Sequence, residues 1–131
     1  MVRTAACRCG ALTATCEGEP VRVSVCHCLA CQRRTGSAFS AQARFPAEKV
    51  RLEGAVSIYV RTADSGNKFA YRFCPACGST VAYEGELQQG LIAIPLGAFA
   101  DPGFPPPRFS VWESRRHPWA AVTGEEVDHT D

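Results

Sequence analysis

The spacing of the cysteines constrains this chain more than any other feature of its sequence. All but one of its eight cysteines fall into three short groups, which are Cys7 and Cys9, then Cys26, Cys28 and Cys31, then Cys74 and Cys77. Zn²⁺ prefers a tetrahedron of sulfur or nitrogen ligands, and a C-x-C or C-x-x-C step offers two sulfurs from a short stretch of backbone. The first and last groups together supply four ligands. They predict a structural zinc site, the Cys₄ cluster, that joins distant parts of the chain.

The middle group has a different stoichiometry. Cys26, Cys28 and Cys31, called the cysteine trio below, offer three ligands. Three protein ligands with one open position are typical of catalytic zinc sites. The sequence therefore predicts two Zn²⁺ ions, one held by four cysteines and one held by three.

Other interpretations of the cysteines stay open at this stage. Disulfides are disfavoured, because the N-terminal residues contain no apolar segment like that of a signal peptide, and we expect a reduced, cytoplasmic protein. A C-x-x-C pair also occurs in thioredoxin-like redox proteins, but there it belongs to a βαβ unit that this sequence lacks. Finally, Cys16 or His27 could complete the trio, which would make both zinc sites structural.

The composition favours a single domain covering residues 1–131, without a strongly charged surface. The 14 Lys and Arg residues and 13 Asp and Glu residues give a net charge of +1, so we expect no nucleic-acid partner. The longest apolar stretch, from Gly90 to Ala100, is shorter than a bilayer-spanning helix of about 20 residues. We therefore expect no membrane partner, and the oligomeric state stays open.

Apolar and polar residues alternate with a period of two along much of the chain, which predicts a mainly β fold. Alternating runs from Val21 to Val25 and from Phe69 to Phe73 lead directly into cysteines. Further strands are predicted at residues 11–16, 37–45, 55–61, 79–83, 91–96 and 109–113. One short helical turn is predicted from Leu29 to Thr35, with Gly36 as its C-terminal cap. The polar tail after about residue 122 is expected to be frayed.

Most aromatic residues in the last third of the chain are expected in the core, since aromatic side chains in a small β domain are usually buried. They are Phe99, Phe104, Phe109, Trp112 and Trp119. Cys16, the one cysteine outside the groups, is expected to be a buried or half-buried free thiol.

The cysteines sit inside longer motifs, which are Cys7-Arg8-Cys9-Gly10, the run CHCLACQRRTG from Cys26 to Gly36, Phe73-Cys74-Pro75-Ala76-Cys77-Gly78, and the late Trp119. In this order they resemble the glutathione-dependent formaldehyde-activating enzymes and their centromere-protein-V-like relatives. The resemblance implies a zinc-bearing β-tent of several short antiparallel sheets with one short helical turn. It also implies that Cys7, Cys9, Cys74 and Cys77 hold structural zinc, while Cys26, Cys28 and Cys31 hold the zinc at which chemistry occurs.

The family resemblance also implies an activity. Its members are associated with making and breaking carbon–sulfur bonds, typified by the addition of glutathione to formaldehyde. The resemblance therefore implies a carbon–sulfur lyase or synthase whose partners are a small-molecule thiol and a small aldehyde. The chain departs from its relatives at Pro107-Arg108-Phe109, in a region where they often carry a histidine.

The chemistry of the trio favours a thiol substrate for an independent reason. Three thiolates around one Zn²⁺ leave a net negative charge, so the ion activates water poorly but still accepts a fourth sulfur. We hypothesise that a substrate thiolate takes the open position and attacks an aldehyde carbonyl. Arg33 and Arg34 follow Cys31 and are candidates to bind the carboxylates of a peptide-like thiol, with a solvated turn of helix as an equal interpretation. The alternative function is a non-catalytic, two-zinc structural or interaction module.

Overall fold

The computed structural model describes all 131 residues and consists mainly of β-strands. The strands are β1 (Val2–Ala6), β2 (Thr13–Glu17), β3 (Arg22–Cys26), β4 (Ser40–Pro46), β5 (Val50–Glu53), β6 (Ser57–Thr62), β7 (Lys68–Phe73), β8 (Thr80–Gly85), β9 (Leu91–Pro95), β10 (Phe109–Val111) and β11 (Asp128–His129). The helices are α1 (Leu29–Thr35) and the short 3₁₀ helices η1 (Ala47–Lys49), η2 (Glu86–Gln88), η3 (Leu96–Phe99) and η4 (Glu113–Arg115). The predicted mainly β fold with one short α-helix is therefore confirmed.

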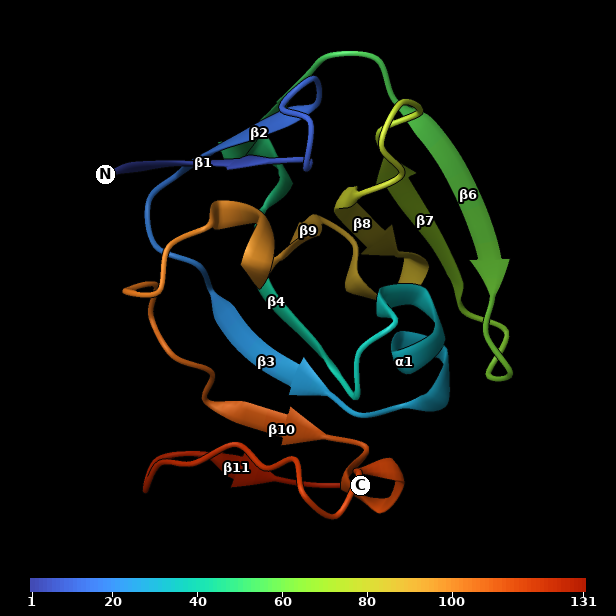
Figure 1. Cartoon of the computed structure of the whole chain (residues 1–131), viewed down its shortest axis with the longest axis vertical. Helices are drawn as coiled ribbons and strands as arrows, with labels where there is room; N and C mark the ends of the chain where they lie inside the picture. The colour runs from blue at the N-terminus through green and yellow to red at the C-terminus, as the bar shows by residue number, and fades with distance from the viewer.

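The strands form two sheets (Figure 1). A three-stranded antiparallel sheet has the order β1-β2-β5. An eight-stranded sheet has the order β11-β10-β3-β4-β9-β8-β7-β6, and its neighbours pair antiparallel except that β10 runs parallel to both β3 and β11. The two end strands, β6 at the right of Figure 1 and β11 at the bottom, run in very different directions. The large sheet is therefore strongly twisted.

The hydrophobic core combines residues of both sheets. One cluster of 15 buried residues brings Ala5 and Ala14 of the small sheet together with Phe45 and Ile94 of the large sheet. Full burial of a large side chain such as Phe45 contributes roughly 1.5–3 kcal/mol. Cys7 and Cys74 belong to the same cluster, so two members of the Cys₄ cluster are part of the core.

The predicted helix begins and ends where the sequence indicates. Cys28 is the N-cap of α1, and its sulfur accepts a hydrogen bond from the backbone N–H of Cys31 at 3.2 Å. At the other end Gly36 has a left-handed conformation, and its N–H donates to the carbonyl of Gln32 at 2.8 Å. The caps place one cysteine of the trio immediately before the helix and another in its first turn.

Three strands were not predicted from the sequence. β1 pairs with β2, from Val2 opposite Glu17 to Ala6 opposite Thr13, and β5 pairs with the other side of β2. The tail after residue 122, expected to be frayed, contains β11, which pairs with β10. Backbone hydrogen bonds to a neighbouring strand hold the polar residues of β11 in place.

The expected burial of the aromatic residues is wrong for the two tryptophans. Trp112 is 51% exposed and Trp119 is 76% exposed, whereas Phe99 and Phe104 stack in the core with ring centroids 4.6 Å apart. Trp112 has a φ of +56°, in the left-handed region, and lies where the chain turns from β10 into η4. Cys16 is a fully buried free thiol, as predicted. None of the helices is long and apolar enough to cross a bilayer.

Candidate functional site

Two similar turns build the Cys₄ cluster, one after β1 and one after β7. Each turn holds two cysteines followed by a glycine, in the segments Cys7-Arg8-Cys9-Gly10 and Cys74-Pro75-Ala76-Cys77-Gly78. Gly10 and Gly78 have φ values of +83° and +80°, and each donates its N–H to the carbonyl of the first cysteine of its turn. A residue with a β-carbon is strained in this conformation, so glycine allows the tight bend that presents two sulfurs together.

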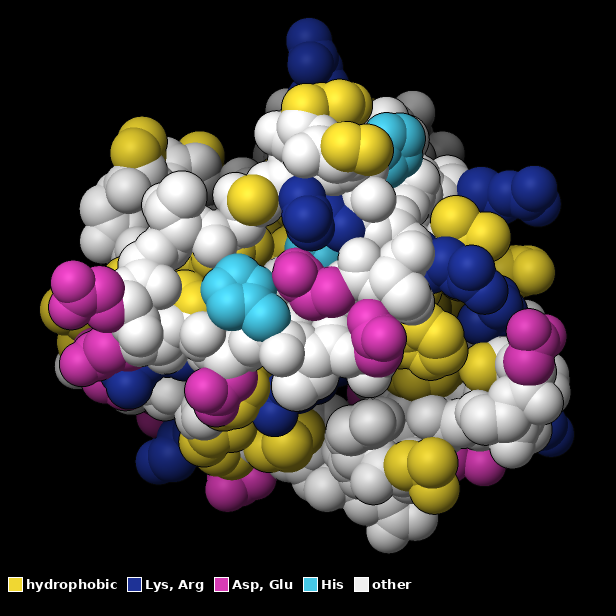
Figure 2. Space-filling view, turned by 90° about the horizontal axis from the view of Figure 1, so that it is seen from below, with side chains coloured by type: hydrophobic (Ala, Val, Ile, Leu, Met, Phe, Trp, Pro, Cys, Tyr) yellow, Lys and Arg dark blue, Asp and Glu magenta, His cyan; other side chains and the backbone are white.

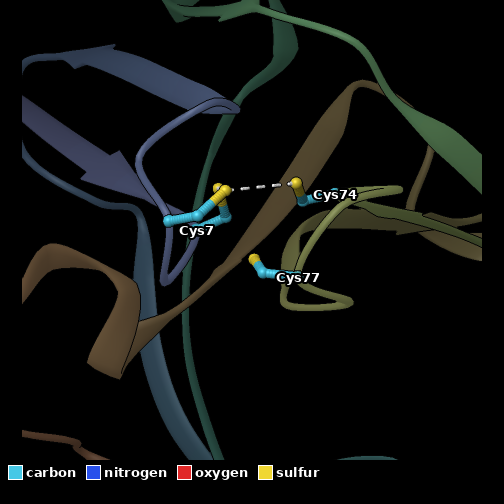
Figure 3. Close-up of side chains that lie close together, drawn as sticks. Cys7, Cys74 and Cys77 are labelled. Carbon is cyan, nitrogen blue, oxygen red and sulfur yellow. Dashed lines mark hydrogen bonds between the residues drawn. The ribbon is translucent and has the colours of Figure 1, made fainter.

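The sulfurs of this cluster face one another. Figure 3 shows Cys7, Cys74 and Cys77 directed toward a common point from the two turns. All four Sγ atoms lie within 4.8 Å of one another, and the Sγ of Cys9 is 3.7 Å from those of both Cys7 and Cys74. Four sulfurs at about 2.3 Å from a zinc ion form a tetrahedron with edges of about 3.8 Å. The cluster therefore has both the donor set and the size that Zn²⁺ requires.

Hydrogen bonds to two of the sulfurs, those of Cys7 and Cys77, favour the thiolate form that metals bind. The backbone N–H of Leu12 donates to the Sγ of Cys7 at 3.2 Å, and this contact lowers the pKa of Cys7. Hydrogen bonding with Ser79 lowers the pKa of Cys77 to about 5. The Ser79 hydroxyl also accepts a hydrogen bond from the backbone N–H of Arg8 at 3.2 Å, which ties the two turns together.

The cysteine trio is built locally, where β3 passes into α1. Cys26 is the last residue of β3, Cys28 caps the helix, and Cys31 lies in its first turn. Their three Sγ atoms lie within 4.8 Å of one another, and all three residues are partly exposed. The valines of β3 are buried on the core side, so the strand delivers Cys26 to the helix from a fixed position.

The three sulfurs of the trio lie close enough to shift one another's pKa. The pKa of Cys28 is lowered because the thiols of Cys26 and Cys31 donate hydrogen bonds to its thiolate, with a further contribution from the N–H of Cys31. The pKa of Cys26 is raised because its proton is held against the sulfur of Cys28. Of the three, Cys28 has the lowered pKa, and a cation among the sulfurs would favour the thiolate form of the other two.

No other side chain completes the trio. None of the His, Asp or Glu ligand atoms of the chain lies within 4.8 Å of all three sulfurs, and neither does a fourth cysteine. Cys16 lies in β2 in the core, and all eight cysteines are free, so no disulfide joins the trio. The trio therefore offers three sulfur ligands of the softness that Zn²⁺ accepts.

The two candidate substrate residues, Arg33 and Arg34, have different surroundings. Arg33 is exposed, and its side chain makes no hydrogen bond or ion pair within the chain. The guanidinium carbon of Arg34 lies 4.8 Å from the ring centroid of Tyr83 and 5.5 Å from that of Tyr71. Burial raises the pKa of both tyrosines, and the nearby Cys31 thiolate adds to this effect. Arg34 is therefore a positioned cation near the trio, held by two rings that sequence reasoning did not single out.

His27 lies between two cysteines of the trio, but its ring bonds to β10. Its Nε2 lies 2.9 Å from the hydroxyl of Ser110, and this hydroxyl in turn donates to the carboxylate of Glu113 at 2.5 Å. Because the Ser110 hydroxyl gives its hydrogen to Glu113, it accepts from the Nε2 of His27, and burial lowers the pKa of this ring. Nothing in the local sequence indicates this contact, because Ser110 and Glu113 reach His27 only through the parallel pairing of β10 with β3.

Gln32 in α1 joins the trio to the segment after β10. Its Nε2 donates to the carbonyls of His27 at 2.9 Å and Arg115 at 3.1 Å. Its Oε1 lies 2.9 Å from the Nε2 of His117. Gln32 directly follows Cys31 in the sequence, and that position inside the central motif was the one available signal for its role.

One hollow of the surface does not lie over either cysteine group. It has a volume of about 390 Å³ and is lined by residues of β6, β7, β8 and the segment after them, including Lys68, Phe69 and Glu84. No cysteine lines it. A ligand at the trio would therefore bind near the partly exposed start of α1 rather than in this hollow.

Comparison with known proteins identifies the family. The sequence model of the family described as "Glutathione-dependent formaldehyde-activating enzyme" matches residues 2–115. A solved structure of a Rhodobacter sphaeroides protein is similar in fold, with a TM-score of 0.57 and 20% sequence identity, over 72% of this chain and 85% of the other. No curated protein matches the chain. Since the family model covers most of the chain, the protein belongs to the family of glutathione-dependent formaldehyde-activating enzymes.

Proposed function

We propose that this protein adds a thiol such as glutathione to formaldehyde or another small aldehyde, and catalyses the reverse reaction, at the cysteine trio. The observation that carries this proposal is the unlike composition of the two cysteine groups. The Cys₄ cluster has four sulfurs and is complete, whereas the trio has three sulfurs and no fourth ligand from the chain. Family membership supports the same reaction.

The reaction forms one carbon–sulfur bond. The sulfur of a thiolate attacks the aldehyde carbon, the π electrons of the carbonyl move to its oxygen, and that oxygen takes a proton from solvent to give a hemithioacetal. Zn²⁺ bound by Cys26, Cys28 and Cys31 would supply a position at which a thiol is held deprotonated at neutral pH. The chain's own contribution is to hold the three thiolates in a fixed arrangement, through the end of β3 and the capped start of α1.

Arg34 is the better of the two candidates for binding the thiol substrate. It lies one helical turn after Cys31 and is held over Tyr83, so it loses little side-chain entropy when it binds a carboxylate. Arg33 is exposed and has no contact that would position it. We therefore assign the substrate carboxylate to Arg34 and treat Arg33 as a solvated residue.

The test measures how fast glutathione, formaldehyde and their adduct interconvert at equilibrium, by exchange NMR, with protein carrying two equivalents of zinc. We expect a rate above the spontaneous one that rises in proportion to protein concentration. Cys28→Ser, carrying one equivalent of zinc, should give no acceleration. If the wild-type protein accelerates the exchange of neither glutathione nor smaller thiols such as cysteine, a non-catalytic two-zinc module is the better description.

A pair of neighbouring variants tests the assignment of the arginine. Arg34→Gln should raise the KM for glutathione about tenfold, the effect of losing a charged hydrogen bond at a partly exposed site. Arg33→Gln is the matched control and should leave the KM within about twofold. Equal effects of the two variants would show that positive charge alone, and not a positioned contact, attracts the substrate.

A further inference from the structure

The C-terminal tail is bound along β10, although the match to the family model ends at residue 115. β11 runs parallel to β10, which runs parallel to β3, the strand that ends at Cys26. The N–H of Thr130 donates to the carbonyl of Ser110 at 2.9 Å, and the N–H of Glu113 donates to the carbonyl of Thr130 at 3.0 Å. The side chain of Asp131 accepts from the N–H of Ser114 at 2.8 Å. Four contiguous tail residues therefore take part in holding the segment that carries Ser110 and Glu113.

Side chains extend this contact toward the trio. One oxygen of Glu113 lies 3.4 Å from the Nδ1 of His129 in the tail. The other accepts the hydrogen bond from Ser110 and lies 3.3 Å from the Nε2 of His27. Figure 2, which views the molecule from the side of β10 and β11, shows histidine and acidic side chains next to one another on this face. Glu113 therefore bridges the tail and His27.

His27 is the point at which this network reaches the trio. Its side chain is 1% exposed, and its peptide groups join Cys26 to Cys28. Ser110 is fully buried, so the bond between His27 and Ser110 is formed away from water. Groups behind the ligands of a metal site orient those ligands, and their loss typically weakens metal binding by about 10- to 100-fold.

We propose that the C-terminal tail is a positioning element of the cysteine trio, and that Glu113 transmits its contact to the loop between Cys26 and Cys28. Glu113, His129 and Ser110 are positioning residues, since none of them touches the sulfurs. The inference rests on the proposed function only in requiring that the trio binds a metal ion. It does not depend on which reaction occurs there.

The experiment compares the full chain with a chain that ends at Val127, which lacks the last four residues. The zinc affinity of each site is measured by chelator competition, and the trio is observed separately through the thiolate-to-cobalt absorption of protein with Co²⁺ in that site. We expect the truncation to weaken the second zinc equivalent about tenfold or more and to change the cobalt spectrum. The first equivalent, in the Cys₄ cluster, should bind unchanged.

Glu126→Ala is the matched control in the same tail. Glu126 pairs only with Arg108, and both side chains are mostly exposed, so its loss should change neither the affinity nor the spectrum. Glu113→Ala should reproduce the effect of the truncation, and the truncation should add little to it, because the two changes remove the same connection. If the truncated chain does not fold, His129→Ala takes its place in this comparison.

Wild-type affinity and spectrum in the truncated chain, or in His129→Ala where that variant replaces it, would overturn the inference. The inference would also be overturned if the truncation and Glu113→Ala, combined in one protein, lowered the zinc affinity by the sum of their separate effects. These measurements use no thiol and no aldehyde. A protein that fails to accelerate the exchange reaction but shows tail-dependent metal binding would therefore refute the proposed function alone.

Discussion

The Cys₄ cluster and the cysteine trio use the same ligand atom in very different parts of the fold. The Cys₄ cluster joins a turn after β1 to a turn after β7, and two of its cysteines are members of the hydrophobic core. The trio lies within one short segment, no member of it belongs to the core cluster, and its support comes from α1 and β10. One group connects regions that are distant in the sequence, and the other shapes a local site.

This difference predicts which of the two metal sites the fold needs in order to form. Bringing distant segments together costs chain entropy, and a metal ion that holds them contributes its binding free energy directly to folding. A metal bound within six residues closes almost no loop, so the fold can form without it. We therefore expect loss of the first metal to unfold the protein and loss of the second to remove only the site.

The largest effect is expected for Cys77→Ser. Structural zinc contributes roughly 10–16 kcal/mol in small finger peptides, which is comparable with the roughly 5–15 kcal/mol of stability of a whole domain. The variant should therefore lack a cooperative unfolding transition at 25 °C, as measured by circular dichroism and by the dispersion of amide NMR signals.

Cys16→Ala is the control for Cys77→Ser. It removes a fully buried sulfur that belongs to no metal group, so it should cost only about 1 kcal/mol and leave a folded protein with two zinc equivalents. A Cys77→Ser protein that remains folded would remove the distinction between the two groups.

An intermediate effect is expected for Cys28→Ser. The protein should bind one zinc equivalent instead of two, and its free energy of unfolding should differ from that of wild type with one equivalent by less than about 1 kcal/mol. The reason is that serine is itself a good N-cap and can accept the hydrogen bond that Cys28 accepts from Cys31. Chemical denaturation at matched zinc content measures this, and global unfolding would contradict the account.

The smallest effect concerns the reactivity of the trio without its metal. The pKa of Cys28 is lowered, so its thiolate persists as the pH falls below the ordinary thiol value of about 8.5 and is lost only at the lowered pKa. With one zinc equivalent bound, Cys28 should therefore be the first cysteine alkylated by iodoacetamide at pH 6, as measured by mass spectrometry.

Cys16 serves as the internal reference in that experiment. Burial raises its pKa to about 11, so it should not react in the folded protein. A pH profile of Cys28 centred on the ordinary thiol value would show that the hydrogen bonds within the trio do not set its ionisation.

The features that could be predicted from the sequence are those that depend on residues close together in the chain. The alternation in β3 and β7 leads into cysteines, and Gly36 ends α1, because strand faces and helix caps depend on residues a few positions apart. β5 also alternates, with Val50 and Leu52 half-buried and Arg51 and Glu53 exposed, but four residues give too short a signal. β1 carries no such alternation and is held by its pairing with β2.

The parts of the site that could not be predicted depend on pairing between distant segments. No acidic residue lies near the trio in the sequence, yet Glu113 reaches His27 because β10 runs parallel to β3. The sequence gives no signal that Tyr71 and Tyr83 contact Arg34, because the two rings come together only through the pairing of β7 with β8. Trp119 was expected in the core and is instead exposed beside His117.

The most direct test is a crystal structure of zinc-loaded protein with anomalous diffraction at the zinc edge. The account predicts two peaks, one surrounded by the sulfurs of Cys7, Cys9, Cys74 and Cys77. The other should be surrounded by the sulfurs of Cys26, Cys28 and Cys31 and by a fourth ligand that is not part of the chain. A single peak, or a second zinc whose fourth ligand is a protein side chain, would contradict the division between a structural and a catalytic metal.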